Sequence, residues 1–589
     1  MKSGKTDRLS GYIFFILSPA ALFFLMEWLL RNPFHEKWGM RPVIMVFNLI
    51  FFYLLELFLL GITGSLRTAL YIEGGFACLT GLIEHYVYKF RGNTVVPWDF
   101  FSLKTAFSVA DNYSYKPEIS TIVILLIFLV LGILFYFCRL SIKKNYRARL
   151  ILSLASLLIT VLFYVPFVQS EKTIKKYRIY DKLFTPSTMT MRDGIVFAFI
   201  YDLKFLNVEK PSGYVKSEAE EMLGEDNGNI AVDENTPNII VIMCEAFSDP
   251  KVLGEFETNE DYMPFIRSLM DSDNTISGDL HVSVLGGNTP NTEFEFLTGN
   301  TMGFLPEGSI PFQQFVTKEM DAMPNTLKEL GYNTIAMHPY NSTGWNRDKV
   351  YPLLGFDKMY FLEHFKGRNP KLIRKYVSDE TLFKEMINIY KENGKKTPLF
   401  SFNVTMQNHS EYSGDLGDFQ PEISIRGFDG DSLIERYLSL EKATDDAFRG
   451  LISYFDSIED PTVVVFFGDH QPNDYVVEPI WNINNKNGKS LNDEERRRRY
   501  TVPYLIWANY DINGRSDLDI SANYLGNLVL DAAGIELTGY RDFLKEKMKS
   551  YPVISAVEEK SSDGTSKDMD KDDPDLSDYR KIQYYEMFE

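Results

Sequence analysis

Two groups of polar residues follow apolar runs of strand length and have the side chains that bind divalent metals. Glu245 comes directly after the run 238–244, and Asp469 and His470 follow the run 462–467 through one glycine. In an open α/β sheet, function gathers at the carboxyl ends of the strands. Carboxylate and imidazole ligands suit Mn²⁺, Mg²⁺ or Zn²⁺, so this pattern predicts a metal site formed by these three residues.

A threonine could act beside that metal. Thr289 lies in the polar loop 285–294, whose sequence favours the start of a helix, with Pro290 expected at the first helical position. A hydroxyl beside a metal can lose its proton and become a nucleophile, and a helix N-terminus stabilises a phosphoryl group. Each residue alone is more simply explained as an edge carboxylate, a turn or a cap. Their joint placement after strands favours catalysis.

The elements that must position these residues predict an α/β domain with a largely parallel sheet. Continuous apolar runs of strand length, typical of strands buried on both faces, lie at residues 238–244, 333–337, 399–406, 462–467 and 502–508. Helical patterns separate them. One is an apolar repeat at every fourth position from Ala443 to Phe455, and another begins after Ser521, runs to Ala533 and stops at Gly534.

The first 170 residues predict a membrane domain of five helices. Apolar runs near the length that spans a bilayer cover residues 12–30, 43–62, 69–88, 121–138 and 150–168. The third is the weakest, because Glu73, Glu84 and His85 interrupt it. The first lacks the small-residue cleavage site of a signal peptide and is expected to be retained.

Basic residues predict the orientation of these helices. They precede the first run and fill the connection between the fourth and fifth runs, at Lys2, Lys5, Arg8, Arg139, Lys143, Lys144, Arg147 and Arg149. By the positive-inside rule, the N-terminus is cytoplasmic and everything after residue 168 is extracellular. The protein is therefore predicted to be a multi-pass protein of the cell membrane, in contact with membrane lipids.

These patterns divide the chain into four parts. We expect a transmembrane domain at residues 1–169, a juxtamembrane linker at 170–235, an extracellular α/β domain at 236–551 and an acidic, disordered tail at 552–589. Within the linker, the apolar segment 195–200 is expected to lie on the membrane surface.

Charge and cysteine usage exclude other classes of protein. The net charge of −19 argues against nucleic-acid binding, which needs a basic face. Cys78, Cys138 and Cys244 have neither disulfide-framework nor metal-site spacing, so a disulfide-stapled fold is not expected.

Short motifs occur in a recognisable order along the α/β part. They are Glu-Ala-Phe at 245–247, Gly-Asn-Thr-Pro-Asn-Thr-Glu-Phe at 287–294, Trp-Asn-Arg-Asp at 345–348, Asn-His at 408–409 and Gly-Asp-His at 468–470. This order resembles the lipoteichoic acid synthase family, which are sulfatase-fold phosphoglycerol transferases. The resemblance covers the five-span membrane part in architecture and about residues 238–534 in motifs. It implies an extracellular domain like those of sulfatases and alkaline phosphatases.

The resemblance also implies a metal, a nucleophile and a reaction. Glu245, Thr289, Asp469 and His470 would bind one divalent metal, usually Mn²⁺, with Mg²⁺ or Zn²⁺ as alternatives. Thr289 would attack phosphatidylglycerol, release diacylglycerol and hold a glycerophosphoryl group. A glycerol-phosphate chain or a glycolipid would then accept that group, as in lipoteichoic acid synthesis for the cell wall.

The same resemblance implies a substrate pocket. Its residues would be His338, Trp345, Arg347 and His409. Arg347 can fork onto two phosphate oxygens, and the histidines can donate hydrogen bonds or shuttle a proton. Core packing is the alternative for Trp345. A salt bridge with Asp348 or Asp357 is the alternative for Arg347.

Two other functions stay open. One is a phosphoethanolamine or other headgroup transferase acting on a surface lipid or glycan. The scattered cysteines weigh against it, because such relatives often carry disulfides and extra zinc-ligating histidines. The other is a non-catalytic scaffold, which would be expected to lack at least one of the four metal-site residues. For a phosphoglycerol transferase, a growing polymer, a primer and a glycan are the alternative acceptors.

Overall fold

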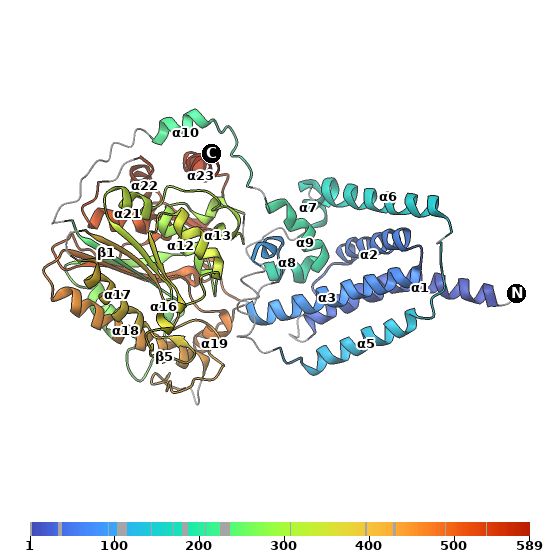
Figure 1. Ribbon diagram of the computed structural model, residues 1–589, viewed down its shortest axis with the longest axis horizontal. Helices are drawn as coiled ribbons and strands as arrows, with labels where there is room; N and C mark the ends of the chain where they lie inside the picture. The colour runs from blue at the N-terminus through green and yellow to red at the C-terminus, as the bar shows by residue number, and fades with distance from the viewer. Residues whose placement is uncertain are drawn as a thin grey trace. The chain divides into compact units, whose positions relative to one another are not determined.

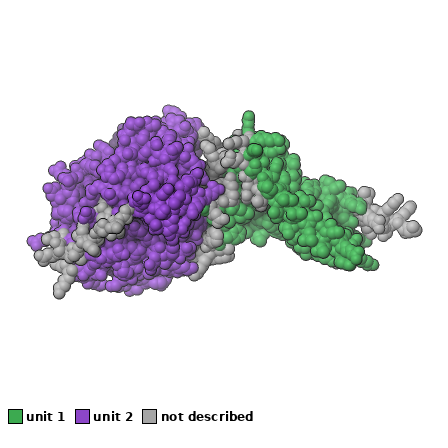
Figure 2. Space-filling view, turned by 90° about the horizontal axis from the view of Figure 1, so that it is seen from above, with its two compact units in different colours: residues 1–103, 109–208 green, residues 104–108, 209–589 purple. Residues whose placement is uncertain are grey.

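A computed structural model provides the coordinates of the chain. It describes all residues except 1–2, 33–37, 92–93, 103–114, 143, 169, 180–185, 207, 224–235, 307, 395–396, 428–431, 489 and 537–538. The chain divides into two compact units, coloured green and purple in Figure 2. Unit 1 comprises residues 1–103 and 109–208, and unit 2 comprises residues 104–108 and 209–589.

Unit 1 is built from long helices (Figure 1). The predicted apolar runs fall on α1 (Ser3–Arg31), α2 (Pro42–Thr63), α3 (Leu66–Arg91), α5 (Ile119–Phe135) and α6 (Tyr146–Phe163). Among the described residues, three segments are long and apolar enough to cross a membrane, namely Gly11–Arg31, Pro42–Thr63 and Tyr146–Val168. Helix α5 is apolar but shorter, and α3 contains the predicted interruptions. The presence of five membrane spans therefore stays a prediction.

Part of the predicted linker packs into unit 1. Helices α8 (Pro186–Asp193) and α9 (Ile195–Asp202) follow the membrane helices. Arg31 donates hydrogen bonds to two carbonyl groups of α8, and Glu27 accepts one from the N–H of Ile195 at 2.7 Å. The first four residues of α9 are buried. Its apolar residues pack on the helix bundle, and the position of this segment on the membrane surface stays a prediction.

The structure describes only part of the remaining predicted linker. Helix α10 (Lys216–Leu223) belongs to unit 2, and residues 224–235 lie outside the described residues. The predicted basic residue Lys143, between the fourth and fifth runs, also lies outside them.

Unit 2 is an α/β domain around one sheet of eight strands in the order β10-β2-β9-β8-β1-β7-β3-β4. The strands are β1 (Asn238–Cys244), β2 (Thr275–His281), β3 (Asn333–Met337), β4 (Lys358–Tyr360), β7 (Leu399–Val404), β8 (Thr462–Gly468), β9 (Thr501–Ala508) and β10 (Ile520–Ser521). Within this sheet, the pairs that β9 forms with β8 and β2 are antiparallel and the other pairs are parallel. The predicted, largely parallel sheet is confirmed.

Helices cover both faces of this sheet. In Figure 1, α12 (Thr289–Thr298) and α21 (Ala522–Ala532) lie on one side, and α17 (Asp379–Asn393) and α18 (Leu433–Asp456) lie on the other. Every residue of β1 and β8 is buried, which explains their continuous apolar sequences. Helix α18 contains the predicted repeat, and α21 ends one residue before the predicted end.

The C-terminal residues are ordered. After β11 (Val553–Ile554) come β12 (Glu558–Lys560) and β13 (Ser566–Asp568), which form a small sheet, and then α23 (Ser577–Phe588). Tyr579 and Ile582 of α23 are fully buried, and the Gln583 side chain bonds both the N–H and the carbonyl of Thr301, at 2.8 and 2.9 Å. The prediction of a disordered tail is wrong, because its acidic average composition conceals apolar residues at helical spacing. The three cysteines are free, as predicted.

Candidate functional site

The parallel pairing of β1 with β8 brings three of the predicted residues together. Cys244 pairs with Gly468 at the carboxyl ends of these strands, so the residues that follow lie side by side. Glu245, Asp469 and His470 are buried and each offers one ligand atom, with all three atoms within 4.8 Å of one another. His470 Nε2 lies 3.3 Å from Asp469 Oδ2 and 3.8 Å from Glu245 Oε1.

The donor atoms of this cluster fit a divalent cation. Asp469 Oδ2 and His470 Nε2 are buried and have no hydrogen-bond partner within the part of the chain that the structure describes. Their companion atoms are engaged, because Asp469 Oδ1 accepts the N–H of Ala246 at 2.7 Å and His470 Nδ1 donates to the Gln471 carbonyl at 2.9 Å. The unpaired imidazole nitrogen is therefore the one that can accept a metal. Buried atoms without partners cost roughly 1–3 kcal/mol each, which a bound cation would offset.

The electrostatics of the carboxylates support the same assignment. Burial, and then the nearby charge of Asp469, raise the pKa of Glu245 well above its ordinary value. Burial likewise raises the pKa of Asp469. Two buried carboxyl groups at this separation resist ionisation together unless a cation compensates their charge.

Thr289 opens α12 beside this cluster. Its hydroxyl donates a hydrogen bond to Glu245 Oε2 at 3.3 Å, and the side chain is nearly buried. The preceding Asn288 has a left-handed backbone with φ of 63°, which turns the glycine-rich loop into the helix. Pro290 occupies the second helical position and not the first, and its missing N–H still costs no intrahelical bond. The hydroxyl thus lies at the positive end of the helix.

Arg347 bonds the carboxylate of Glu293, a partner that the sequence analysis did not predict. Its Nε donates to Glu293 Oε1 at 3.0 Å and its Nη2 bonds the same carboxylate, whereas the alternative to phosphate binding named Asp348 or Asp357 as the partner. Tyr351 donates its hydroxyl to Glu293 Oε2 at 2.6 Å. Burial alone would lower the pKa of Arg347, but Glu293 and Tyr351 raise it above its ordinary value. The guanidinium is therefore permanently charged.

Glu293 also links the arginine to the threonine. It lies on α12 four residues after Thr289, about one helical turn. Arg347 Nη1 has no hydrogen-bond partner among the described residues, so one edge of the guanidinium remains for a ligand. One helix thus positions both the hydroxyl and the buried cation. The spacing of Glu293 from Thr289 on a predicted helix was the available signal in the sequence.

The two predicted pocket histidines lie after strands, as expected. His338 follows β3, and its Nδ1 donates to the Val404 carbonyl at 3.1 Å. His409 comes after β7, and its Nδ1 lies 3.2 Å from the hydroxyl of Tyr376. Burial lowers the pKa of His338 well below its ordinary value and lowers that of His409 to about 3. Both imidazoles are therefore neutral and can each donate one hydrogen bond and accept another.

Electrostatic coupling connects the pocket residues to the cluster. The charge of Arg347 lowers the pKa of both Glu245 and His338, after the larger effects of burial. His470 similarly contributes to the lowered pKa of His409. The structure therefore brings the predicted metal and pocket residues into one site, with Trp345 beside Arg347 in the chain.

Trp345 and Arg374 add detail that the sequence did not predict. Trp345 is partly exposed, so core packing does not explain it, and its φ of 57° places a bulky residue in the left-handed region. Arg374 Nη2 donates to the carbonyls of Gln407 and His409, at 2.7 and 2.8 Å. Arg374 thereby fixes the loop that carries His409.

Comparison with known proteins gives one family and several relatives. The Sulfatase family model matches residues 237–535, just over half of the chain. A Rhizobium meliloti (strain 1021) protein whose name refers to cyclic beta-1,2-glucan modification is 28% identical over 382 residues, 62% of this chain and 56% of that protein. Lipoteichoic acid synthase 1 of Bacillus subtilis (strain 168) is 25% identical over 406 residues, 67% of this chain and 57% of that protein. The chain thus spans little more than half the length of these relatives.

Solved structures with a similar fold include one of a phosphoglycerol transferase. It is the Streptococcus pyogenes phosphoglycerol transferase GacH in complex with sn-glycerol-1-phosphate. The match has a TM-score of 0.51 and 24% identity, and it covers 64% of this chain and 94% of that chain.

Proposed function

The chain belongs to the sulfatase family, and we propose that it is a metal-dependent phosphoglycerol transferase of the cell membrane. Its donor would be phosphatidylglycerol, and Thr289 would carry the glycerophosphoryl group. One observation carries the proposal. The Thr289 hydroxyl, at a helix N-terminus, bonds Glu245 within a cluster that leaves buried Asp469 and His470 atoms unpaired.

The cluster supports binding of one cation. Glu245, Asp469 and His470, with Thr289, would hold Mn²⁺, or else Mg²⁺ or Zn²⁺. When bound, such an ion favours the deprotonated threonine and neutralises charge at phosphorus.

In the first step, Thr289 Oγ1 attacks the phosphorus of the lipid and its proton passes to Glu245 Oε2, 3.3 Å away. Glu245 Oε2 already accepts the hydrogen bond of this hydroxyl, so it lies where the proton leaves. The bond between phosphorus and the diacylglycerol oxygen breaks, and this oxygen takes a proton from water as diacylglycerol leaves. Thr289 then carries the glycerophosphoryl group.

In the second step, an acceptor hydroxyl attacks the same phosphorus. The bond from phosphorus to Thr289 breaks, and Glu245 returns its proton to the threonine oxygen. The acceptor proton leaves to water. Arg347, held by Glu293, would bind phosphoryl oxygens through its free Nη1 edge in both steps.

The membrane part and the acceptor belong to the same proposal. The apolar helices of unit 1 and the basic connection between α5 and α6 support a multi-pass protein with five spans, its N-terminus cytoplasmic and unit 2 extracellular. The similarity to a lipoteichoic acid synthase supports a glycerol-phosphate chain or a glycolipid as the acceptor.

A second candidate acceptor has a specific observation in its favour. The Rhizobium meliloti relative, which is 28% identical to this chain, is named for modification of a cyclic glucan. The same donor chemistry could therefore modify a surface glycan, because the acceptor enters the reaction only as a hydroxyl group.

The test is diacylglycerol release from headgroup-labelled phosphatidylglycerol by the purified full chain with Mn²⁺, comparing wild type with Thr289→Ala. We expect release by wild type alone, with label trapped on Thr289 when no acceptor is present. Release from phosphatidylethanolamine and not from phosphatidylglycerol would assign a phosphoethanolamine transferase instead. Equal release by both proteins would remove the role of Thr289.

A further inference from the structure

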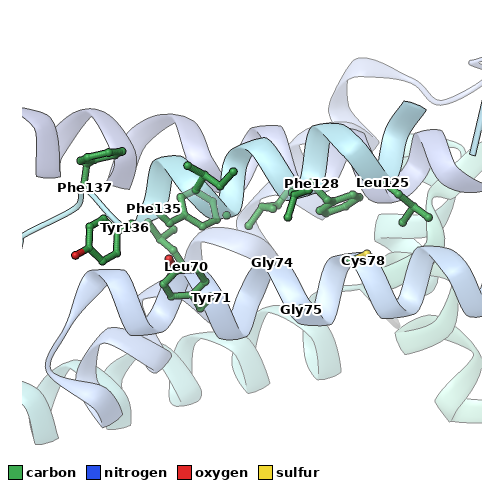
Figure 3. Close-up of a pocket in the computed structure, with 14 residues that line it drawn as sticks. Leu70, Tyr71, Gly74, Gly75, Cys78, Leu125, Phe128, Phe135, Tyr136 and Phe137 are labelled. Carbon is green, nitrogen blue, oxygen red and sulfur yellow. The ribbon is translucent and has the colours of Figure 1, made fainter. Parts of the chain in front are cut away.

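Unit 1 contains an apolar groove between α3 and α5. Its volume is about 640 Å³, and Figure 3 shows Cys78 near one end and Tyr136 and Phe137 near the other. The described lining is aliphatic, aromatic or glycine, apart from the sulfur of Cys78 and the hydroxyls of Tyr71 and Tyr136. An occupant with a polar body would find almost no hydrogen-bond partners here.

Glycines make the groove deep. A Cβ atom added at Gly75 or at Gly132 would meet no atom within 4 Å, so open space lies above both backbones. At Gly74, by contrast, a Cβ atom would touch Leu22 and Phe135 at 3.6 Å, which shows where the helices already pack. The groove is therefore a gap beside a packed contact and not a loosely packed seam.

One end of the groove is basic. Arg67 Nε donates to the Cys138 carbonyl at 3.0 Å, and its guanidinium lies 5.1 Å from the centre of the Tyr136 ring. The segment 139–149 that follows contains five Lys or Arg residues and no acidic residue. Arg67 therefore places a cationic group where Tyr136 ends the apolar lining.

From this arrangement we infer that the groove binds one acyl chain of an anionic phospholipid, with the headgroup at the end that carries Arg67 and Tyr136. The inference rests on the membrane placement proposed above. Tyrosine at such an end matches its preference for the level of the headgroups. Each basic residue near the membrane surface contributes roughly a five-fold preference for an anionic lipid.

This lipid is distinct from the reacting donor. In the proposed orientation, the basic end of the groove faces the cytoplasm, whereas Thr289 belongs to the extracellular unit. The bound lipid would therefore be a resident partner of the membrane helices.

The test uses the full chain in nanodiscs of phosphatidylcholine that contain a trace of lipid with a photoreactive acyl chain. One probe has a phosphatidylglycerol headgroup and the other a phosphatidylcholine headgroup, and labelled peptides are identified by mass spectrometry. We expect the anionic probe to label α3 and α5 along the groove at least five-fold more than the neutral probe. The exposed residues Leu158 and Leu162 of α6, which lie farther along the helix from the basic segment, report general contact with lipid and should be labelled equally by both probes.

Variants separate the groove from its surroundings. Gly75→Leu with Gly132→Leu fills the open space and should reduce groove labelling at least five-fold, with α6 labelling unchanged. Gly450→Leu on α18 is the matched control, because its added Cβ also meets no atom within 4 Å. It should leave the labelling unchanged. Arg67→Gln should reduce the preference for the anionic headgroup.

The outcomes are distinguishable. Groove labelling that the leucine variants do not reduce, or that does not exceed α6 labelling, would overturn the acyl-chain site. Equal labelling by the two probes would overturn the anionic headgroup. Absence of label from both the groove and α6 would overturn the membrane placement itself, whereas diacylglycerol release tests the catalytic proposal separately.

Discussion

Replacing Glu293 by glutamine is expected to disable Arg347 while Thr289 stays in place. The carboxylate accepts bonds from Arg347 Nε and Nη2 through Oε1, and through Oε2 it accepts from the Tyr351 hydroxyl and, at 3.3 Å, from Arg347 Nε. Glutamine keeps the volume and one oxygen but loses the charge. Its oxygen can still accept from Arg347, while its amide group must then donate to Tyr351, whose hydroxyl reverses its role.

The expected magnitude follows from these contacts. Removing one partner of a buried ion pair completely costs about 3–5 kcal/mol, and a hydrogen bond to a charged group contributes about 1.5–3 kcal/mol. Because Glu293→Gln retains an acceptor for Arg347, the free energy of unfolding should fall by about 2–3 kcal/mol. A misplaced phosphate-binding group costs on the order of 100-fold in rate, which corresponds to about 2.7 kcal/mol of barrier.

The assay combines stability with turnover. Urea unfolding of the purified chain gives the loss of stability, and diacylglycerol release gives kcat and KM. We expect kcat/KM to fall about 100-fold, mainly through kcat, with Mn²⁺ affinity within a few-fold of wild type. Metal affinity is spared because Glu293 is not among the residues that converge on the cation site.

A matched variant distinguishes this effect from general instability. Glu385 is also a buried carboxylate with nitrogen partners, since it bonds His364 at 2.6 Å and Arg368 at 3.0 Å. Glu385→Gln on α17 should lose comparable stability and keep wild-type turnover. Wild-type kcat/KM in Glu293→Gln, or an equal loss of turnover in Glu385→Gln, would refute the reasoning.

Further predictions concern the nucleophile, the metal and pH. Thr289→Ala should lower turnover at least about a thousand-fold and should also weaken Mn²⁺ binding measured by calorimetry, because Thr289 is a proposed ligand. Residual transfer above that level would exclude Thr289 as the nucleophile. Mn²⁺ at 100 times its Kd should raise the free energy of unfolding of chelator-treated protein by about 2.7 kcal/mol. The affinity for Mn²⁺ should rise from pH 5.5 to 7.5, because protons must leave Glu245 and Asp469 before the ion binds. An affinity for Mn²⁺ that does not depend on pH would contradict this prediction. Burial raises the pKa of Glu295 to about 7, so the folded protein keeps a proton that the unfolded chain loses above about pH 4.5. The free energy of unfolding should therefore fall by up to about 3 kcal/mol as the pH rises through that window. Glu295→Gln should remove this decline when urea unfolding is compared at pH 5 and pH 8. Identical pH profiles of stability for the two proteins would refute the raised pKa of Glu295.

The core of the candidate site could be predicted because its position depends on local sequence. Glu245 and Asp469 directly follow buried parallel strands, and adjacent parallel strands bring their carboxyl ends to one edge. The pair of Glu293 with Arg347 depends instead on tertiary packing between residues 54 positions apart. A local pattern could identify each side chain but not their contact.

The same distinction explains the errors in the fold. Strand β2 has the sequence Thr-Ile-Ser-Gly-Asp-Leu-His, and its polar residues concealed a strand that pairing with β9 stabilises. In the tail 552–589, an acidic average composition outweighed the apolar residues of α23, such as Tyr579, whose ring contacts Phe304 and Phe543. Composition averaged over a segment thus misses elements whose stability comes from neighbours distant in the chain.

The contact between α23 and the end of α12 sets an order for folding. The Tyr579 hydroxyl donates to the carbonyl of Gly299 at 2.6 Å, across 280 residues of chain. At 5–20 residues per second, the ribosome needs roughly 15–60 s to make that stretch. During this interval the helix that bears Thr289 has its far end uncovered. The nascent unit must therefore be kept from aggregating, and it gains a complete support for its nucleophile only when α23 has emerged.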